Sequence, residues 1–298
     1  RDRAAKFLEG TAPYGDGVGE VESLSVLADY AAHLTSLVPL QGERPLRIVV
    51  DAANGMAGLT VPAVFGEARG IEIIPMYFEL DGSFPNHEAN PLEPANLVDL
   101  QAAVLREHAD LGLAFDGDAD RCFVIDELGQ PVTPSAVAAM VAKREIIRVR
   151  NSGETGPIPV LHNLLCSRTV AEIIAENGGV PIRTRVGHSL IKDQMKKTGA
   201  IFGGEHSAHY YFAEFWGADN GMLAALHVIA EVRARTEALS TIAQEYSRYV
   251  ESGEINTTVE DQELVIAKIL DVFGSRGEQD SLDGLTMSGV TPEGWWWL

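Results

Sequence analysis

Cysteine is scarce in this chain. The 298 residues include only two cysteines, Cys122 and Cys166, which show no metal-ligand spacing and no framework of pairs. This scarcity excludes a fold stapled by disulfides and a structural zinc site of spaced cysteines, and it fits a reducing compartment. We interpret both cysteines as small core residues, not as nucleophiles.

Long apolar runs are also missing. No run approaches the ~20 residues that a membrane-spanning helix needs, and no charged and then apolar leader opens the chain. We therefore expect a soluble cytoplasmic protein without a membrane partner. The chain starts at an arginine and ends in GWWWL, so we expect both of its ends to be cut.

Positive charge is outnumbered. The chain has 23 lysines and arginines against 43 aspartates and glutamates, a formal net charge of −20. Nucleic acid and anionic membrane surfaces do not tolerate a broadly acidic protein that lacks a strong basic patch, which excludes nucleic acid as the expected partner. An anionic ligand would need positive contacts that are concentrated locally.

The order of the expected elements predicts an α/β fold with more than one domain. A hydrophobic content of 46% over this length suffices for two or more cores, because single cores stop growing at about 250–300 residues. The first expected series consists of helix 21–38, strand 46–50, strand 71–78, helix 95–107 and strands 111–115 and 121–126. Such a series predicts a parallel or mixed sheet covered by helices, over residues 21–128.

A second α/β domain is expected over residues 129–253. Its series consists of helices 133–149, 167–179, 189–199, 219–234 and 238–249 and strands 156–163, 180–186 and 200–204. The similar length of the two units suggests a duplicated architecture, without a repeat at the level of residues.

The two ends of the chain do not continue the pattern of the two α/β series. A strand at 253–259, a helix at 261–274 and two strands within 282–298 predict the start of a third, α+β unit over residues 254–298. This unit is too short to bury its own apolar face. Residues 1–20 are expected to be a remnant of a preceding domain or a linker.

Three aspartates follow the strand at 111–115 at every second position. In FDGDADR, residues 115–121, the carboxylates of Asp116, Asp118 and Asp120 would repel one another without a cation. Alternate residues of an extended loop point the same way, so the three would offer hard oxygen ligands for Mg²⁺. The alternative, a solvated acidic turn, is disfavoured because strands on both sides would anchor the loop.

Two other known motifs could also explain these residues. An EF-hand loop would use the three aspartates and Glu127, but it requires glycine where Arg121 stands, and helices on both sides. A phosphatase of the haloacid dehalogenase type would use Asp116 as nucleophile and Asp118 as acid/base. Asp120, however, stands where that family has threonine or valine. A non-catalytic module that binds metal or sugar phosphate remains a third alternative.

A second constellation is GGEHSAH, residues 203–209. Two glycines allow close approach of a ligand to the backbone, and a carboxylate and a hydroxyl suit the vicinal hydroxyls of a sugar. Alternatively, Glu205 and His209 merely pair with each other, since a buried carboxylate needs a partner whatever its role.

The segment RTRVGHSLIK, residues 183–192, places Gly187 and His188 at a helix start, where free N–H groups and the helix dipole favour an anion. Arg185, His188 and Lys192 would supply the local positive charge. Lys192 is equally well explained as a solvated helix residue, and Arg183 lies further from the loop.

Together, these motifs resemble those of the α-D-phosphohexomutases, the phosphomannomutase and phosphoglucomutase family. FDGDADR resembles the family's metal-binding loop, GGEHSAH its sugar-binding loop, and RTRVGHSLIK a segment between them, in the family's order. The resemblance covers roughly residues 20–298. It implies the second and third domains and the opening of the fourth.

The resemblance also implies roles for individual residues. Asp116, Asp118 and Asp120 would hold Mg²⁺ together with a phosphoserine oxygen, and Arg121 would contact the transferring phosphoryl group. Glu205 and Ser207 would grip ring hydroxyls, and His209 would carry a proton beside the reacting centre. His188 is the first candidate for a contact with the phosphosugar, and Arg185 is the second.

The implied reaction interconverts hexose 6-phosphate and hexose 1-phosphate, of mannose or glucose, through hexose 1,6-bisphosphate. The donor serine lies in a loop resembling Thr-Ala-Ser-His-Asn-Pro, and the fourth domain adds a phosphate-binding loop; this sequence contains neither. We therefore predict no turnover by this chain alone. By the same resemblance, His206, in the variable position of the sugar loop, favours mannose or glucose over glucosamine, whose mutases tend to have glutamine there. DAANGMAG, residues 51–58, is predicted to be a structural turn, and Trp295 to Trp297 are core candidates.

Overall fold

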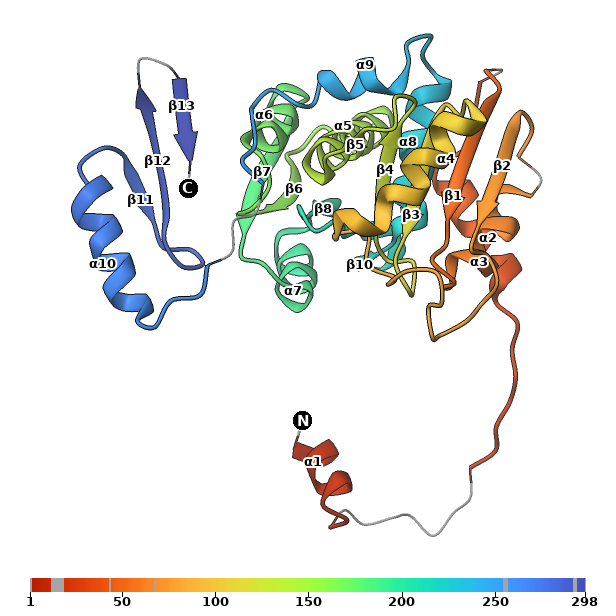
Figure 1. The fold of residues 1–298 in the computed structure, drawn as a ribbon, viewed down its shortest axis with the longest axis horizontal. Helices are drawn as coiled ribbons and strands as arrows, with labels where there is room; N and C mark the ends of the chain where they lie inside the picture. Colours follow the sequence, from red (N-terminus) through yellow and green to blue (C-terminus); the bar gives the residue numbers. More distant parts are fainter. Residues whose placement is uncertain are drawn as a thin grey trace.

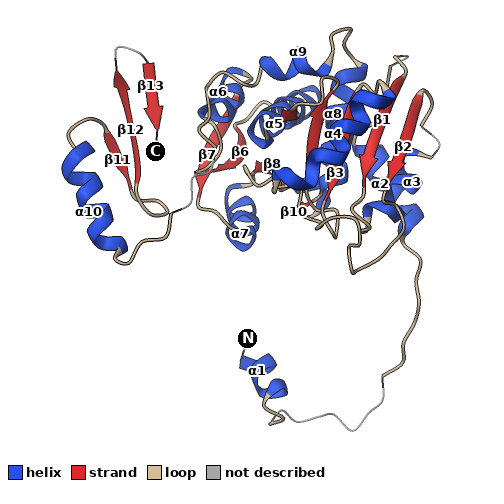
Figure 2. Cartoon of the chain, in the orientation of Figure 1, coloured by secondary structure: helices blue, strands red, loops and turns tan. Residues whose placement is uncertain are grey.

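Alternation of buried strands with helices gives two five-stranded mixed sheets, with a smaller antiparallel sheet beyond them (Figures 1 and 2). The computed structural model describes residues 2–11, 19–42, 44–66, 68–253, 257–291 and 294–297. The predicted class, two consecutive α/β units with helix-covered mixed sheets and a third smaller unit, is confirmed. Within the described ranges, no helix has the length and apolar character to cross a bilayer.

The first sheet has the strand order β2-β1-β3-β4-β5. Its strands are β1 Leu46–Asp51, β2 Ile71–Met76, β3 Leu111–Phe115, β4 Cys122–Asp126 and β5 Pro131–Val132. β1 pairs parallel with β2 and β3, whereas the pairs β3–β4 and β4–β5 are antiparallel. β3 is buried along its whole length, as the continuous apolar run LGLAF indicates. The sheet takes its last strand from beyond residue 128, the boundary expected from the sequence.

Helices α2 Leu27–Leu37, α3 Ala57–Phe65 and α4 Val98–Glu107 accompany this sheet, and a 3₁₀ turn, η1 Pro94–Leu97, precedes α4. The helix predicted from residue 21 begins only at Leu27. Residues 21–26 are exposed, so no packing stabilises a helical turn there despite their apolar spacing.

The second sheet has the strand order β10-β9-β8-β6-β7. Its strands are β6 Ile158–Asn163, β7 Gly179–Thr184, β8 Phe202–Gly204, β9 Tyr210–Phe212 and β10 Ala218–Asp219. β6 pairs parallel with β7 and β8, and β8–β9 and β9–β10 are antiparallel. Traced from β7, this sheet repeats the strand order and directions of the first. The predicted duplication is therefore present in the topology.

The helices of the second unit begin and end close to their predicted positions, with one exception. They are α5 Pro134–Asn151, α6 Arg168–Glu176, α7 His188–Thr198, α8 Gly221–Arg233 and α9 Leu239–Gln244, with a 3₁₀ turn η2 Ala213–Phe215. The helix predicted at 238–249 already ends at Gln244. The short strands β9 and β10 were not predicted, because two or three residues carry no periodicity.

A continuous hydrophobic core runs through both units, beside a smaller cluster under α7. A single cluster of buried side chains includes Leu34 of α2, Phe115 of β3, Ala138 of α5, Phe202 of β8 and Val228 of α8. α5 touches both β4 and β8, and α8 touches β4 and α5. Separate cores were expected, but these two central helices are buried on several sides and join them. This shared packing holds the two sheets in a defined relation.

The two ends of the chain pack less. α1 Asp2–Leu8 buries none of its residues and lies apart from the sheets (Figure 1). The third unit has helix α10 Gln262–Phe273 and strands β11 Glu278–Asp280, β12 Thr286–Thr291 and β13 Gly294–Trp297, in the order β11-β12-β13. α10 buries no residue either, as expected for so short a unit. The strand predicted at 253–259 includes residues 254–256, which lie outside the described residues. So do the side chains of Trp295 to Trp297.

Both cysteines are expected to be unreactive in the native protein. Cys122 and Cys166 are buried, and burial raises the pKa of the Cys166 thiol to about 12 and that of Cys122 further. Since the thiolate is the reacting form, a disulfide reagent at neutral pH should label neither thiol in the folded chain and both in denaturant. Stoichiometric labelling of the native protein would contradict their assignment to the core.

Candidate active site

The three aspartates of the loop between β3 and β4 converge. Asp116, Asp118 and Asp120 each offer a carboxylate oxygen within 4.8 Å of the others. The predicted cause, alternation along an extended loop, is wrong. The loop is a tight turn in which the Ala119 N–H donates to the Asp116 carbonyl at 3.2 Å and Ala119 is left-handed, with φ of 63°. It is this turn that brings the carboxylates together.

Arg121 is bound to the first of the aspartates. Its backbone N–H donates to Asp116 Oδ1 at 3.1 Å, and its Nε donates to Asp116 Oδ2 at 2.8 Å. Nη1 donates to Asn90 Oδ1 at 3.2 Å, from the loop before η1. The predicted ion pair with an aspartate is thus present, and it fixes the guanidinium beside the acidic loop. A phosphoryl contact by Arg121 remains a prediction.

Asp120 fits a role as a cation ligand. Burial, followed by the charges of Asp116, Asp118 and Asp219, raises the pKa of its carboxyl to about 7. Its Oδ1 is buried and has no hydrogen-bond partner among the described residues. A buried polar atom without a partner needs an explanation, and a bound cation would supply one while offsetting the repulsion.

The turn DAANGMAG contacts the acidic loop and supports it. Met56 N–H donates to the Gly117 carbonyl at 2.9 Å, and a Cβ on Gly55 would lie 2.6 Å from that same oxygen. A Cβ on Gly58 would lie 2.1 Å from the Phe78 carbonyl oxygen. The small residues allow two backbone segments to touch, so the prediction of a structural turn is confirmed.

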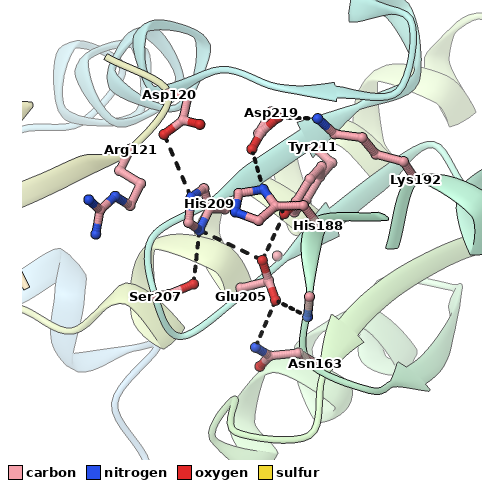
Figure 3. A network of polar contacts seen from close by, with 12 residues as sticks. Asp120, Arg121, Asn163, His188, Lys192, Glu205, Ser207, His209, Tyr211 and Asp219 are labelled. Carbon is pink, nitrogen blue, oxygen red and sulfur yellow. Dashed lines mark hydrogen bonds and ion pairs between the residues drawn. The ribbon is translucent and has the colours of Figure 1, made fainter. Parts of the chain in front are cut away.

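The segment GGEHSAH connects β8 to β9 and meets the acidic loop. An isolated antiparallel bridge joins Arg121 to His209, so the motifs of the two sheets lie side by side (Figure 3). Ser207 Oγ and His209 Nδ1 are 3.0 Å apart. His206 instead contacts Ser135 Oγ through its Nδ1 at 2.8 Å.

Glu205 is a buried carboxylate with three donors. Tyr211 OH donates to Oε2 at 2.7 Å, Asn163 Nδ2 donates to Oε1 at 3.2 Å, and the Gly187 N–H donates to Oε1 at 3.4 Å. His209 Nδ1 lies 3.7 Å from Oε2, too far for a hydrogen bond. His209 thus lies at ion-pair distance from Glu205, as the alternative expected, but the hydrogen bonds to this carboxylate come from the three other groups.

A further group of polar side chains, His188, Lys192 and Asp219, lies beside His209. His188, at the start of α7, has its Nδ1 3.0 Å from Asp219 Oδ2, and Lys192 Nζ lies 2.8 Å from Asp219 Oδ1. The rings of His188 and His209 are edge to face, with centroids 4.1 Å apart. Burial and then the charge of His188 lower the pKa of His209 to about 4, so its imidazole is neutral at pH 7. Burial favours a higher pKa for Asp219, but the Lys192 hydrogen bond helps hold it below the usual value.

Several of these residues were missed at the level of sequence. Tyr211 stands two residues after His209 in a strand, so alternation could have placed both on one face. Asp219 has no local signal, because only the pairing of β10 with β9 brings it opposite Tyr211. Asn163 and Asn90 likewise depend on tertiary contacts. Lys192, expected equally to be a solvated residue, pairs with Asp219.

The two arginines of the segment 183–192 face the third unit. Arg185 pairs with Asp283 at 3.1 Å, Arg183 pairs with Asp280, and the Val186 N–H donates to Asp283 Oδ2 at 3.2 Å. Arg185 is thus not brought into the cluster around His209. A role for it in binding the phosphosugar remains a prediction.

The variant Tyr211→Phe is expected to lower the free energy of unfolding by about 1–3 kcal/mol, because it leaves a buried oxygen of Glu205 without its hydroxyl donor. Urea unfolding measures the difference. Tyr249→Phe, at a hydroxyl that donates to Glu172 in a less buried position, is the matched control and should cost less. Equal losses in the two variants would contradict the importance of the buried hydrogen bond.

Comparison with known proteins agrees with this arrangement. Residues 28–129 match the family described as phosphoglucomutase/phosphomannomutase, alpha/beta/alpha domain II, and residues 133–249 match domain III. A phosphomannomutase/phosphoglucomutase of Pseudomonas aeruginosa is 36% identical over 283 residues, which cover 94% of this chain and 59% of the relative. A phosphomannomutase of Escherichia coli is 32% identical over 276 residues, covering 91% and 59%. The chain thus spans less than two thirds of these relatives.

Solved structures give the same result. A phosphoglucomutase/phosphomannomutase family protein from Burkholderia thailandensis superposes with a TM-score of 0.79 at 27% identity, over 95% of this chain and 59% of the other. An N-acetylphosphoglucosamine mutase of Aspergillus fumigatus, solved in complex with GlcNAc-6P and magnesium, has a TM-score of 0.59 at 14% identity, over 89% and 63%. The second likeness concerns the fold alone.

Proposed function

Because the chain belongs to the phosphoglucomutase/phosphomannomutase family, we propose that its two central loops form part of the site of a metal-dependent hexose phosphate mutase. The reaction is the interconversion of hexose 6-phosphate and hexose 1-phosphate. The observation that carries the proposal is the bridge between Arg121 and His209, which sets the three aspartates beside the loop of Glu205 and Ser207.

Asp116, Asp118 and Asp120 would hold Mg²⁺, which when bound neutralises the charge that develops on a transferring phosphoryl group. Arg121 is a permanently charged planar fork, which suits phosphate oxygens. It is already oriented by Asp116 and Asn90.

The second sheet would bind the sugar. Ser207 is partly exposed and would contact a ring hydroxyl, while Glu205, held by Tyr211, would contact another. His209 has a lowered pKa and would accept a proton as a neutral imidazole. His188, at the start of α7, and Lys192, one turn further along it, would contact the phosphate group, to which Lys192 would add positive charge.

The phosphoryl donor in this proposal is a phosphoserine that this sequence does not contain, and hexose 1,6-bisphosphate is the intermediate. We therefore expect no turnover by these residues alone. Mannose or glucose phosphates are the proposed substrates. The reason is that a histidine at the variable position of the sugar loop, here His206, resembles phosphomannomutases and phosphoglucomutases more than glucosamine mutases.

A phosphatase with Asp116 as nucleophile is less well supported. Both carboxylate oxygens of Asp116 accept hydrogen bonds from Arg121, one from its backbone and one from its guanidinium. These bonds occupy both oxygens and so lower their nucleophilicity, whereas they suit a fixed metal ligand.

The test is a titration of the chain with mannose 6-phosphate, with and without Mg²⁺, followed by phosphorus NMR. We expect binding, with neither release of inorganic phosphate nor conversion to the 1-phosphate. Glu205→Ala should weaken binding, and His108→Asn, at an exposed left-handed position before β3, at the opposite end of that strand from the acidic loop, should not. Release of phosphate would favour the phosphatase. Conversion would overturn the prediction of inactivity, and absence of binding would overturn the assignment of the sugar site.

A further inference from the structure

Four side chains from separate segments meet next to the acidic loop. Asp120 comes from that loop, His188 from the start of α7, His209 from the residue before β9, and Asp219 from β10 (Figure 3). Each offers one nitrogen or oxygen atom, and these four atoms all lie within 4.8 Å of one another. We call this group the His-Asp cluster.

The spacing within the His-Asp cluster suits one small cation. Bonds of about 2.0–2.1 Å from a tetrahedral ion place neighbouring ligand atoms about 3.3 Å apart. His188 Nδ1 and Asp219 Oδ2 are 3.0 Å apart, and His209 Nε2 and Asp120 Oδ1 are 3.6 Å apart. Both distances lie close to the tetrahedral edge, so small side-chain adjustments would suffice.

Neighbouring groups already hold these side chains in place. Lys192 binds the other oxygen of Asp219 at 2.8 Å, and Ser207 Oγ lies 3.0 Å from Nδ1 of His209, leaving its Nε2 toward Asp120. Partners of this kind orient ligands in metal sites and fix the imidazole tautomer.

One ligand atom also lacks any other partner. Asp120 Oδ1 is buried and accepts no hydrogen bond from the described residues, and His209 Nε2 at 3.6 Å is beyond hydrogen-bonding distance. Buried polar atoms without a partner are rare, and metal coordination would satisfy this one.

We propose that the His-Asp cluster is a second cation site, which binds Zn²⁺. Two imidazoles with two carboxylates suit zinc, whereas the three carboxylates of the acidic loop suit magnesium. The two sites share Asp120, so each ion withdraws a ligand from the other. Zinc binding here is independent of whether the family's mutase activity applies to this chain.

The experiment measures Zn²⁺ affinity of the full chain by competition with a chromogenic chelator, and Co²⁺ absorption as a report of coordination geometry. The unchanged chain should bind one equivalent of Zn²⁺ at the cluster and give the intense visible bands of tetrahedral Co²⁺. His188→Gln and Asp219→Asn should weaken Zn²⁺ binding at least ~100-fold, because loss of even an outer partner costs about 10- to 100-fold.

Two matched variants separate the sites. Asp118→Asn removes a ligand of the acidic loop only, and should leave Zn²⁺ affinity within a few fold of the unchanged chain; His108→Asn removes an exposed histidine elsewhere and should do the same. Circular dichroism verifies that each variant is folded. The proposal is overturned if Zn²⁺ does not bind, if His188→Gln and Asp219→Asn bind it as tightly as His108→Asn, or if Asp118→Asn abolishes binding.

Discussion

Replacing Asp118 with asparagine is expected to abolish the stabilisation of the chain by Mg²⁺. Asp118 is exposed, so the change removes a ligand without disturbing the core. At a Mg²⁺ concentration of about 100 times Kd, the unchanged chain should gain about 2.7 kcal/mol in free energy of unfolding. The variant should gain almost nothing, because the loss of a direct ligand should lower its Mg²⁺ affinity at least ~100-fold. Loss of a residue that only orients a ligand already costs about 10- to 100-fold.

Without a metal, the substitution should not lower the free energy of unfolding. In EDTA the Asp118→Asn variant should be no less stable than the unchanged chain, since one of three like charges is gone. Urea unfolding with Mg²⁺ and with EDTA measures both values. Asp271→Asn, on the exposed face of α10, is the control for a simple change of net charge. A variant that keeps its stabilisation by Mg²⁺ would show that the acidic loop is not the metal site.

Replacing Gly55 with alanine is expected to damage the acidic loop from outside it. The new Cβ would lie 2.6 Å from the Gly117 carbonyl oxygen and 2.9 Å from its Cα, both of them backbone atoms that cannot rotate away. We expect a loss of about 1–3 kcal/mol in free energy of unfolding, as for other overpacked sites. Because the displaced residue lies between Asp116 and Asp118, Mg²⁺ affinity should fall as well.

Gly82→Ala is the matched control for this change. A Cβ on Gly82 would meet no atom within 4 Å, so both stability and Mg²⁺ affinity should be nearly unchanged. Unfolding curves and calorimetric titration of both variants give the comparison. If Gly55→Ala lost stability but bound Mg²⁺ as tightly as Gly82→Ala, the turn would support the fold without positioning the metal loop.

Much of this fold follows from local pattern. The apolar run LGLAF predicts a strand buried on both faces, and β3 is buried throughout. Helical spacing with a capping threonine places α5, whose Thr133 side chain accepts from the Ala136 N–H at 3.2 Å. Where no such local signal exists, as in the two residues of β10, only pairing with a neighbouring strand creates the element.

The sequence by itself determined the kinds of group that the site contains: three carboxylates after one strand, and a carboxylate, a hydroxyl and two imidazoles after another. Short-range spacing suffices for this, because each set lies within a single loop. Only the tertiary structure decided which of them meet. The core shared through α5 and α8 brings Arg121 against His209, and the pairing of β10 with β9 adds Asp219 to the histidines. The tertiary structure also placed Asp283 of the third unit beside Arg185, which pairs with it and not with the groups around His209.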